Sequence, residues 1–91
     1  MYYLLFYKTV DNYEERREPF RQLHLKHVQD SIARGEFKMG GAYTDPPDGA
    51  ALVFEADDRT AVEEFASRDP YVQNGLITHW EVRAWNVVIQ A

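Results

Sequence analysis

The first strand of this chain is indicated by an unbroken run of apolar residues near the N-terminus. Residues 2–7 are Tyr-Tyr-Leu-Leu-Phe-Tyr, and aromatic and branched side chains of this kind favour a β-strand. A strand with one face in water would alternate apolar and polar residues. Because this run does not alternate, we expect the strand to be buried on both faces.

A helix is predicted next, from about residue 18 to residue 34. Pro19 is tolerated in the first turn of a helix, and Gly35 suits the position just beyond its end. His24 falls inside the apolar arc of this helix and His27 at its edge, so both are expected to need polar partners. The apolar side chains expected to face the core are Phe20, Leu23, Val28 and Ile32.

Three further strands and a second helix follow. Residues 36–43 and 50–56 are predicted as strands, and the turn-forming residues between them as their exposed connection. Asp57 or Asp58 is expected to cap a helix over residues 59–67. Residues 76–88 are predicted as the last strand. Within them, one set of side chains alternates with another and the two would lie on opposite faces: Thr78, Trp80, Val82 and Ala84 against Ile77, His79, Glu81, Arg83 and Trp85.

The predicted order of elements is β-α-β-β-α-β, in a single domain of residues 1–91. Right-handed crossovers fold this order into a four-stranded antiparallel sheet with both helices on one face, the ferredoxin-like α+β arrangement. The other face of the sheet then exposes apolar side chains of the first strand. Because such a patch usually marks an interface, we expect a homodimer in which two sheets pack face to face with twofold symmetry.

Composition excludes several functions. The chain has 10 basic and 15 acidic residues, and its net charge of −5 argues against binding nucleic acid. It has no cysteine, which excludes disulfides and thiolate chemistry. Residues 2–7 are too few to span a bilayer and lack the features of a secretory signal, so we expect a cytoplasmic protein without a membrane partner. His24, His27 and His79 show no metal-ligand pattern, and no metal or other cofactor is predicted.

The segment that follows the second helix contains the most distinctive polar pattern. Pro70 disfavours a helical conformation at Asp69, so the helix is expected to stop there and Asp69 to cap a short turn that begins at Pro70. Gly75 suits the left-handed residue that ends such a turn. Capping fixes the direction of the Asp69 carboxylate. Two interpretations stay open: a purely structural cap, or a cap that also takes part in chemistry.

Three other side chains are candidates for binding a small molecule. Arg21 lies about one turn before His24 on the same helix surface, and its guanidinium can pair with a substrate carboxylate through two hydrogen bonds. A surface salt bridge is the structural alternative for Arg21. Tyr43 and Tyr71 are candidates for lining the pocket, although aromatic residues beside a sheet also serve packing alone.

With these residues in view, the chain resembles the YciI-like (YCII-related) family over essentially its whole length. The resemblance lies in Arg21-x-x-His24-Leu25, Gly35, Gly41, residues 45–50, Asp69-Pro70-Tyr71-Val72 with Gly75-Leu76, and Trp80-Glu81-Val82-Arg83-x-Trp85. It implies a dimeric α/β-barrel fold, which agrees with the predicted order of elements. It also implies an active-site pair, His24 and Asp69, and a similarity to chloromuconolactone dehalogenases and other cofactor-free enzymes.

Two functions from different classes follow. The first is a small cofactor-independent enzyme, lyase-, dehalogenase- or isomerase-like, in which Asp69 orients His24 and His24 moves a proton on a small anionic organic molecule. The second is a non-catalytic homodimer that binds a small ligand, with Asp69 as a cap and His24 as a core histidine. Only the first requires His24 for turnover.

Overall fold

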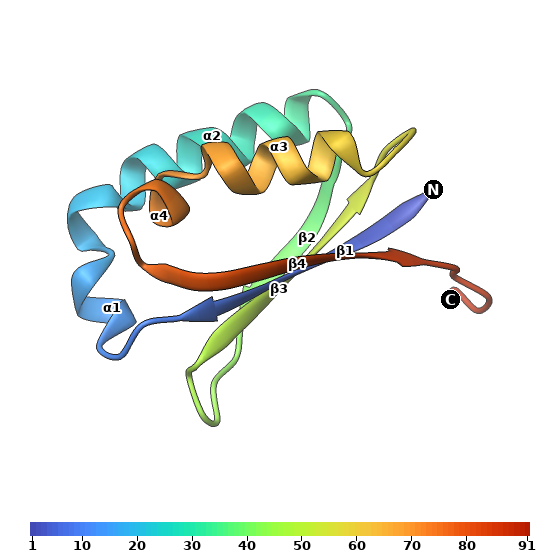
Figure 1. The fold of residues 1–91 in the computed structure, drawn as a ribbon. Coiled ribbons are helices and arrows are strands. Elements are labelled where there is room, and N and C mark those ends of the chain that lie inside the picture. The colour runs from blue at the N-terminus through green and yellow to red at the C-terminus, as the bar shows by residue number, and fades with distance from the viewer.

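The fold is a four-stranded antiparallel sheet with its helices on one face (Figure 1), as predicted. A computed structural model describes residues 1–91. The strands are β1 (Tyr2–Thr9), β2 (Phe37–Ala42), β3 (Gly49–Glu55) and β4 (Ile77–Trp85). The helical elements are α1 (Tyr13–Arg16), the 3-10 turn η1 (Glu18–Phe20), α2 (Arg21–Ala33), α3 (Thr60–Arg68) and α4 (Pro70–Gln73).

The core lies between the sheet and the two long helices, α2 and α3. The strand order β2-β3-β1-β4 places β1 in the middle, where Leu5 pairs with Leu52 of β3 and Val82 of β4. Helix α3 begins at Thr60, whose backbone N–H donates to Asp58 Oδ1 over 2.9 Å, but its N-cap residue is Arg59, so neither Asp57 nor Asp58 occupies the predicted cap position. Its Phe65 is buried against the sheet.

Burial of β1 corrects one expectation. Tyr3, Leu5 and Tyr7 face the helices and are buried, whereas Leu4 and Phe6 face away and are only half-buried. The strand is therefore not fully buried on both faces in the single chain, because no helix covers the second face of the sheet (Figure 1).

The orientation of α2 corrects a second expectation. Leu23 and Ile32 were expected in the core but are 60% and 45% exposed. The helix instead turns a more polar side toward α3 and α4, with His24, Val28 and Ser31 on it. Phe20, His24 and Val28 of the predicted arc do face the protein, so the arc was wrong only at Leu23 and Ile32. Periodicity alone could not include the polar partners that α3 and α4 offer to the histidines.

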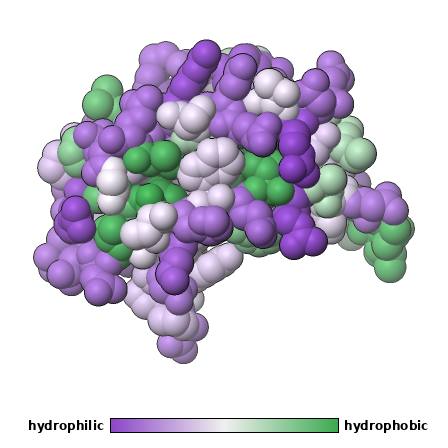
Figure 2. All heavy atoms as spheres, in the orientation of Figure 1, coloured by the Kyte–Doolittle hydropathy of each residue, from purple (hydrophilic) through white to green (hydrophobic).

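The last strand is shorter than predicted. β4 ends at Trp85, and residues 86–91 have no regular structure. Val88 and Ile89 are 79% and 89% exposed, and Figure 2 shows hydrophobic atoms at this end of the chain and hydrophilic ones over the helices. None of the helices is long and apolar enough to cross a membrane.

Candidate functional site

The junction between α3 and α4 holds Asp69 in a fixed direction, as the sequence predicted. Helix α3 stops at Arg68, and Asp69 is extended (φ −65°, ψ 123°) because Pro70 follows it. Asp69 Oδ1 accepts a hydrogen bond from the Tyr71 backbone N–H over 3.0 Å, which caps α4. Gly75 ends the segment in the left-handed conformation (φ 76°).

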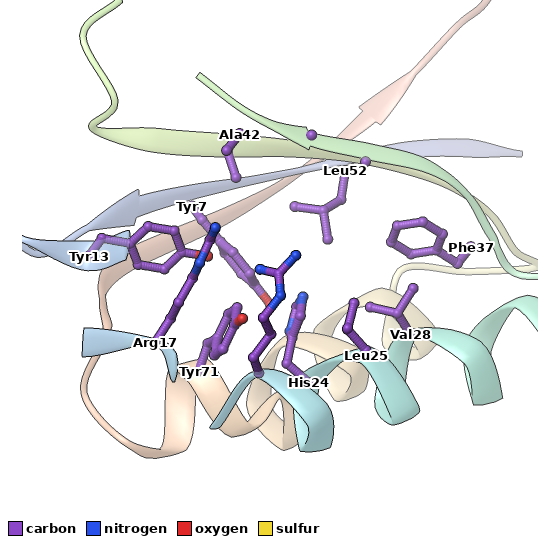
Figure 3. Close-up of a pocket in the computed structure, with 14 residues that line it drawn as sticks. Tyr7, Tyr13, Arg17, His24, Leu25, Val28, Phe37, Ala42, Leu52 and Tyr71 are labelled. Atoms are coloured by element: carbon purple, nitrogen blue, oxygen red, sulfur yellow. The ribbon is translucent and has the colours of Figure 1, made fainter. Parts of the chain in front are cut away.

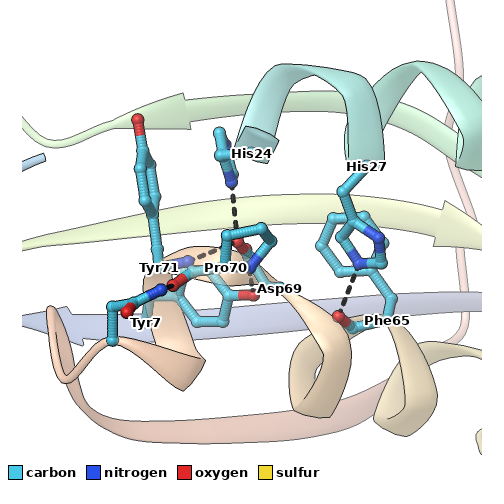
Figure 4. Close-up of polar contacts among 8 residues, drawn as sticks. Tyr7, His24, His27, Phe65, Asp69, Pro70 and Tyr71 are labelled. Carbon is cyan, nitrogen blue, oxygen red and sulfur yellow. Dashed lines mark hydrogen bonds and ion pairs between the residues drawn. The ribbon is translucent and has the colours of Figure 1, made fainter. Parts of the chain in front are cut away.

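Two further hydrogen bonds satisfy the Asp69 carboxylate, which is fully buried. Tyr7 donates from Oη to Oδ2 over 2.8 Å, and His24 Nδ1 lies 2.8 Å from Oδ1 (Figure 4). A buried carboxylate is stable only with such partners. Burial and the nearby Asp69 carboxylate raise the pKa of Tyr7 well above its usual range, so Tyr7 remains a hydrogen-bond donor at every physiological pH.

His24 combines a fixed ring with access to a cavity. Its imidazole stacks on the Tyr71 ring, with 3.9 Å between centroids and 8° between planes. Because Asp69 offers only acceptor atoms, Nδ1 is assigned the proton, and Nε2 of the neutral ring is left as a proton acceptor. The side chain is 16% exposed and lines the cavity.

The cavity lies between the start of α2 and the sheet and has a volume of about 270 Å³. This is below the range of about 300–1,000 Å³ typical of drug-sized ligands, so it suits a smaller molecule. Figure 3 shows a polar end with Tyr13, Arg17 and Tyr71, and an apolar end with Val28 and Phe37.

The predicted binding residues divide into two groups. Arg21 and Tyr71 line the cavity together with His24. Tyr43 does not line it, which corrects that expectation: its ring is 42% exposed and lies beside Gly49 in the connection between β2 and β3.

Three polar cavity residues were missed in the sequence: Tyr7, Tyr13 and Arg17. Tyr7 was taken only as part of an apolar strand. Tyr13 and Arg17 fall in a charged stretch that gave no helical pattern, although Arg17 lies four residues before Arg21. That spacing, which places two arginines on one side of a helical segment, is the signal from which the second arginine could have been found.

His27 belongs to the scaffold and not to the cavity. Its Nε2 lies 2.8 Å from the Phe65 carbonyl oxygen, to which it donates, and its ring stacks on the Phe65 ring with 4.4 Å between centroids. This carbonyl lies in the last turn of α3, where intrahelical partners run out. No three His, Cys, Asp or Glu side chains come together in a way that could hold a metal ion.

Comparison with known proteins identifies the family. Together, the sheet order and the helices on one face define the ferredoxin-like α+β fold class. Residues 1–86 match the YCII-related domain, and the chain belongs to the YCII-related family. An uncharacterized protein of Haemophilus influenzae is 25% identical over 85 residues, which cover 84% of this chain and 87% of that protein.

A solved structure shows the same fold. It is the 5-chloro-2-hydroxyhydroquinone dehydrochlorinase TftG from Burkholderia phenoliruptrix AC1100, in complex with 2,5-dihydroxybenzoquinone. Its TM-score to this chain is 0.78 at 22% sequence identity, over 94% of both chains. At this identity the likeness establishes the fold alone.

Proposed function

We propose that this protein is a small cofactor-independent enzyme in which His24 and Asp69 form an acid–base dyad that acts on a small anionic organic molecule. The observation that carries the proposal is the 2.8 Å contact between His24 Nδ1 and Asp69 Oδ1, on a ring that also borders the cavity. An imidazole oriented by a carboxylate through one nitrogen exchanges protons through the other.

The chemistry that fits this arrangement begins with proton abstraction. His24 Nε2 takes a proton from a carbon next to a carbonyl group, and the electron pair of the C–H bond moves toward the carbonyl oxygen. Arg21, on the same side of the cavity, stabilises the negative oxygen. Return of the proton to another carbon completes an isomerisation, whereas departure of a halide with its bonding electrons completes an elimination.

The elimination outcome has support from the fold neighbour. TftG is named as a dehydrochlorinase, and loss of HCl is an elimination of this kind. The lyase- or dehalogenase-like form of the proposal therefore deserves the first experiments, with isomerisation as the other outcome of the same first step.

The second candidate function is binding without catalysis. It is favoured by the complete satisfaction of Asp69, which caps α4 and joins three elements and so has a structural role whatever the reaction. The two functions make different demands on His24. Ligand binding requires only the shape of its ring, whereas catalysis requires the ring to accept and return a proton.

The test compares native protein with His24→Asn on small chlorinated and unchlorinated organic acids that carry a C–H next to a carbonyl group. Chloride release and product formation report turnover, and calorimetry reports binding. His27→Asn serves as the control, because His27 lies outside the cavity. Loss of turnover with retained affinity in His24→Asn supports the enzyme, and equal turnover in both proteins contradicts it.

We further propose that two chains pair through the open face of the sheet. Leu4, Phe6 and Val53 lie on this face and are half-buried, and Trp85 at its margin is 42% exposed. Light scattering after size-exclusion chromatography should give a dimer for the native chain and a monomer for Phe6→Glu. A native monomer at micromolar concentration would contradict this arrangement.

A further inference from the structure

Two arginines at the polar end of the cavity carry charges that no acidic side chain neutralises. Arg17 and Arg21 are the only basic residues of this chain that are half-buried, since every other lysine and arginine is exposed. Neither forms a salt bridge, although the chain has more acidic than basic residues. Partial burial of an uncompensated charge is unfavourable, so this end of the cavity is suited to an anion.

Two polar atoms at the same end are buried without a well-formed hydrogen bond: Arg17 Nε and Tyr71 Oη. The Arg21 guanidinium offsets part of the rise that burial causes in the pKa of Tyr71, but it can only donate to the Tyr71 oxygen, so the Tyr71 O–H has no acceptor within the protein. Tyr71 as a whole is only 2% exposed, so bulk water does not readily replace the missing partner. Buried groups without partners are uncommon in folded proteins, and a ligand oxygen that accepts from both would satisfy them.

The groups that face such a ligand are mostly donors. Burial raises the pKa of Tyr13 and of Tyr71 above the usual value. A hydrogen bond with Arg17 and its charge offset part of the shift of Tyr13, and the charges of Arg17 and Arg21 offset part of the shift of Tyr71. Both hydroxyls therefore stay protonated at neutral pH and can donate. The guanidinium of Arg17 lies 5.3 Å from the centre of the Tyr13 ring, which holds it at the cavity wall.

Although neither arginine is paired directly with an acidic side chain, charge balance at this end favours a ligand with a single negative charge. Two arginines and the Asp69 carboxylate leave one net positive charge at this end when His24 is neutral. Beyond His24 the lining changes to apolar side chains: Leu25, Val28, Phe37 and Leu52 (Figure 3). The cavity thus has a direction, with an anionic head at one end and a hydrocarbon part at the other.

We propose that Arg17, with Arg21 and the hydroxyl of Tyr71, forms a head-group site for a monoanion whose charge is shared by two oxygens, such as a carboxylate, and that the apolar part of the ligand lies toward Phe37. This inference rests on the ligand-binding part of the proposed function and not on proton transfer. It places the first carbons beyond the head group beside His24, which Figure 3 shows between the two ends.

Benzoate and benzamide are matched probes for this site, because they have the same shape and differ in charge. Calorimetry should show benzoate binding at least tenfold more tightly than benzamide to the native protein. Arg17→Met keeps most of the side-chain volume and removes the charge, so it should lose that preference. Arg16→Met is the control, since it makes the same charge change at an exposed neighbour and should keep the preference.

A second variant protects the test against a folding defect in Arg17→Met. Tyr71→Phe keeps the ring that stacks on His24 and removes a hydroxyl whose proton has no acceptor, so its melting temperature should be unchanged or higher. Its benzoate affinity should nevertheless fall severalfold. Equal affinity of the native protein for both probes, no benzoate binding, or unchanged preference in Arg17→Met would overturn the inference.

These outcomes are separable from those that test catalysis. His24→Asn leaves the head-group site intact and should bind benzoate within about threefold of the native protein even though it is inactive. A negative benzoate experiment would contradict the head-group site but not proton transfer by His24 and Asp69. A negative turnover experiment would contradict proton transfer but not the head-group site.

Discussion

Tyr7 donates a hydrogen bond to Asp69 across 62 residues of sequence, with 2.8 Å between Oη and Oδ2. This contact joins the middle strand of the sheet to the junction of α3 and α4, and it holds the carboxylate from the side opposite His24 (Figure 4). The position of Asp69, on which the proposed acid–base chemistry depends, is therefore set by three elements at once.

Removal of this donor should destabilise the fold. Tyr7→Phe leaves Oδ2 of a fully buried carboxylate without a partner, and we expect a loss of about 1–3 kcal/mol in the free energy of unfolding. Turnover should also fall, because one of the three hydrogen bonds that hold the Asp69 carboxylate against His24 is lost. Urea denaturation measures the first effect; a stability within 0.5 kcal/mol, roughly the scatter of surface substitutions, would contradict the assigned role.

Stability should fall at alkaline pH because of the same hydroxyl. Burial and Asp69 raise the pKa of Tyr7 above the ordinary value of 10.0, so above that pH the unfolded chain loses this proton while the folded chain keeps it. The free energy of unfolding should then decrease by about 1.4 kcal/mol per pH unit from this group.

Denaturation midpoints between pH 9 and pH 11 would show this effect. The slope should be shallower in Tyr7→Phe and unchanged in Tyr43→Phe, since Tyr43 is 42% exposed and serves as the matched tyrosine control. An equal slope in the native protein and in Tyr7→Phe would show that other groups cause the alkaline loss.

Substitutions of the two histidines of α2 should have different effects, one on stability and the other on activity. His27→Leu removes the donor to the Phe65 carbonyl, and we expect a loss of about 1 kcal/mol in stability with little change in turnover or ligand affinity. His24→Asn should abolish turnover. If His27→Leu reduced turnover as strongly as His24→Asn at a temperature where both are folded, the distinction between scaffold and site would be wrong.

Adjacent glycines in β2 offer a test of the cavity. A Cβ at Gly40 would lie 2.8 Å from Phe37 Cζ and 3.3 Å from Leu52 Cγ, both at the apolar end, whereas a Cβ at Gly41 has no atom within 4 Å. Gly40→Ala should therefore displace Phe37 and weaken ligand binding severalfold. Gly41→Ala is the matched comparison, because Gly41 also lines the cavity but its Cβ would displace no side chain, so its affinity should fall less; equal affinities in the two variants would argue against a ligand at this end.

Sequence reasoning located the carboxylate because its signals are local. Asp before Pro stops a helix and caps the next turn, and the structure has this arrangement at Asp69 and Pro70. The contact with His24 was implied by family resemblance, and the structure brings the two side chains together. Order of elements also predicted the sheet, because β-α-β-β-α-β permits few right-handed topologies.

What escaped prediction depends on contacts between distant segments. The side of α2 that faces inward is decided by acceptors on α3 and α4, among them a backbone carbonyl of Phe65 that carries no sequence signal. Likewise, Tyr7 looked like any core aromatic, and its hydroxyl gained a role only because Asp69 is placed opposite it. Arg17 lies between the short helix α1 and the turn η1, which the apolar pattern does not reveal.

Proton transfer by His24 is the central claim, and hydrogen–deuterium exchange tests it most directly. In D₂O, native protein should catalyse loss of the C3 proton signal of 2-oxobutyrate or of another enolisable carboxylate shown to bind. His24→Asn should be slower by about 100-fold or more, within the range of general acid–base catalysis, while His27→Asn keeps the native rate. Exchange as fast in His24→Asn as in the native protein, or none for any carboxylate that binds, would contradict the account.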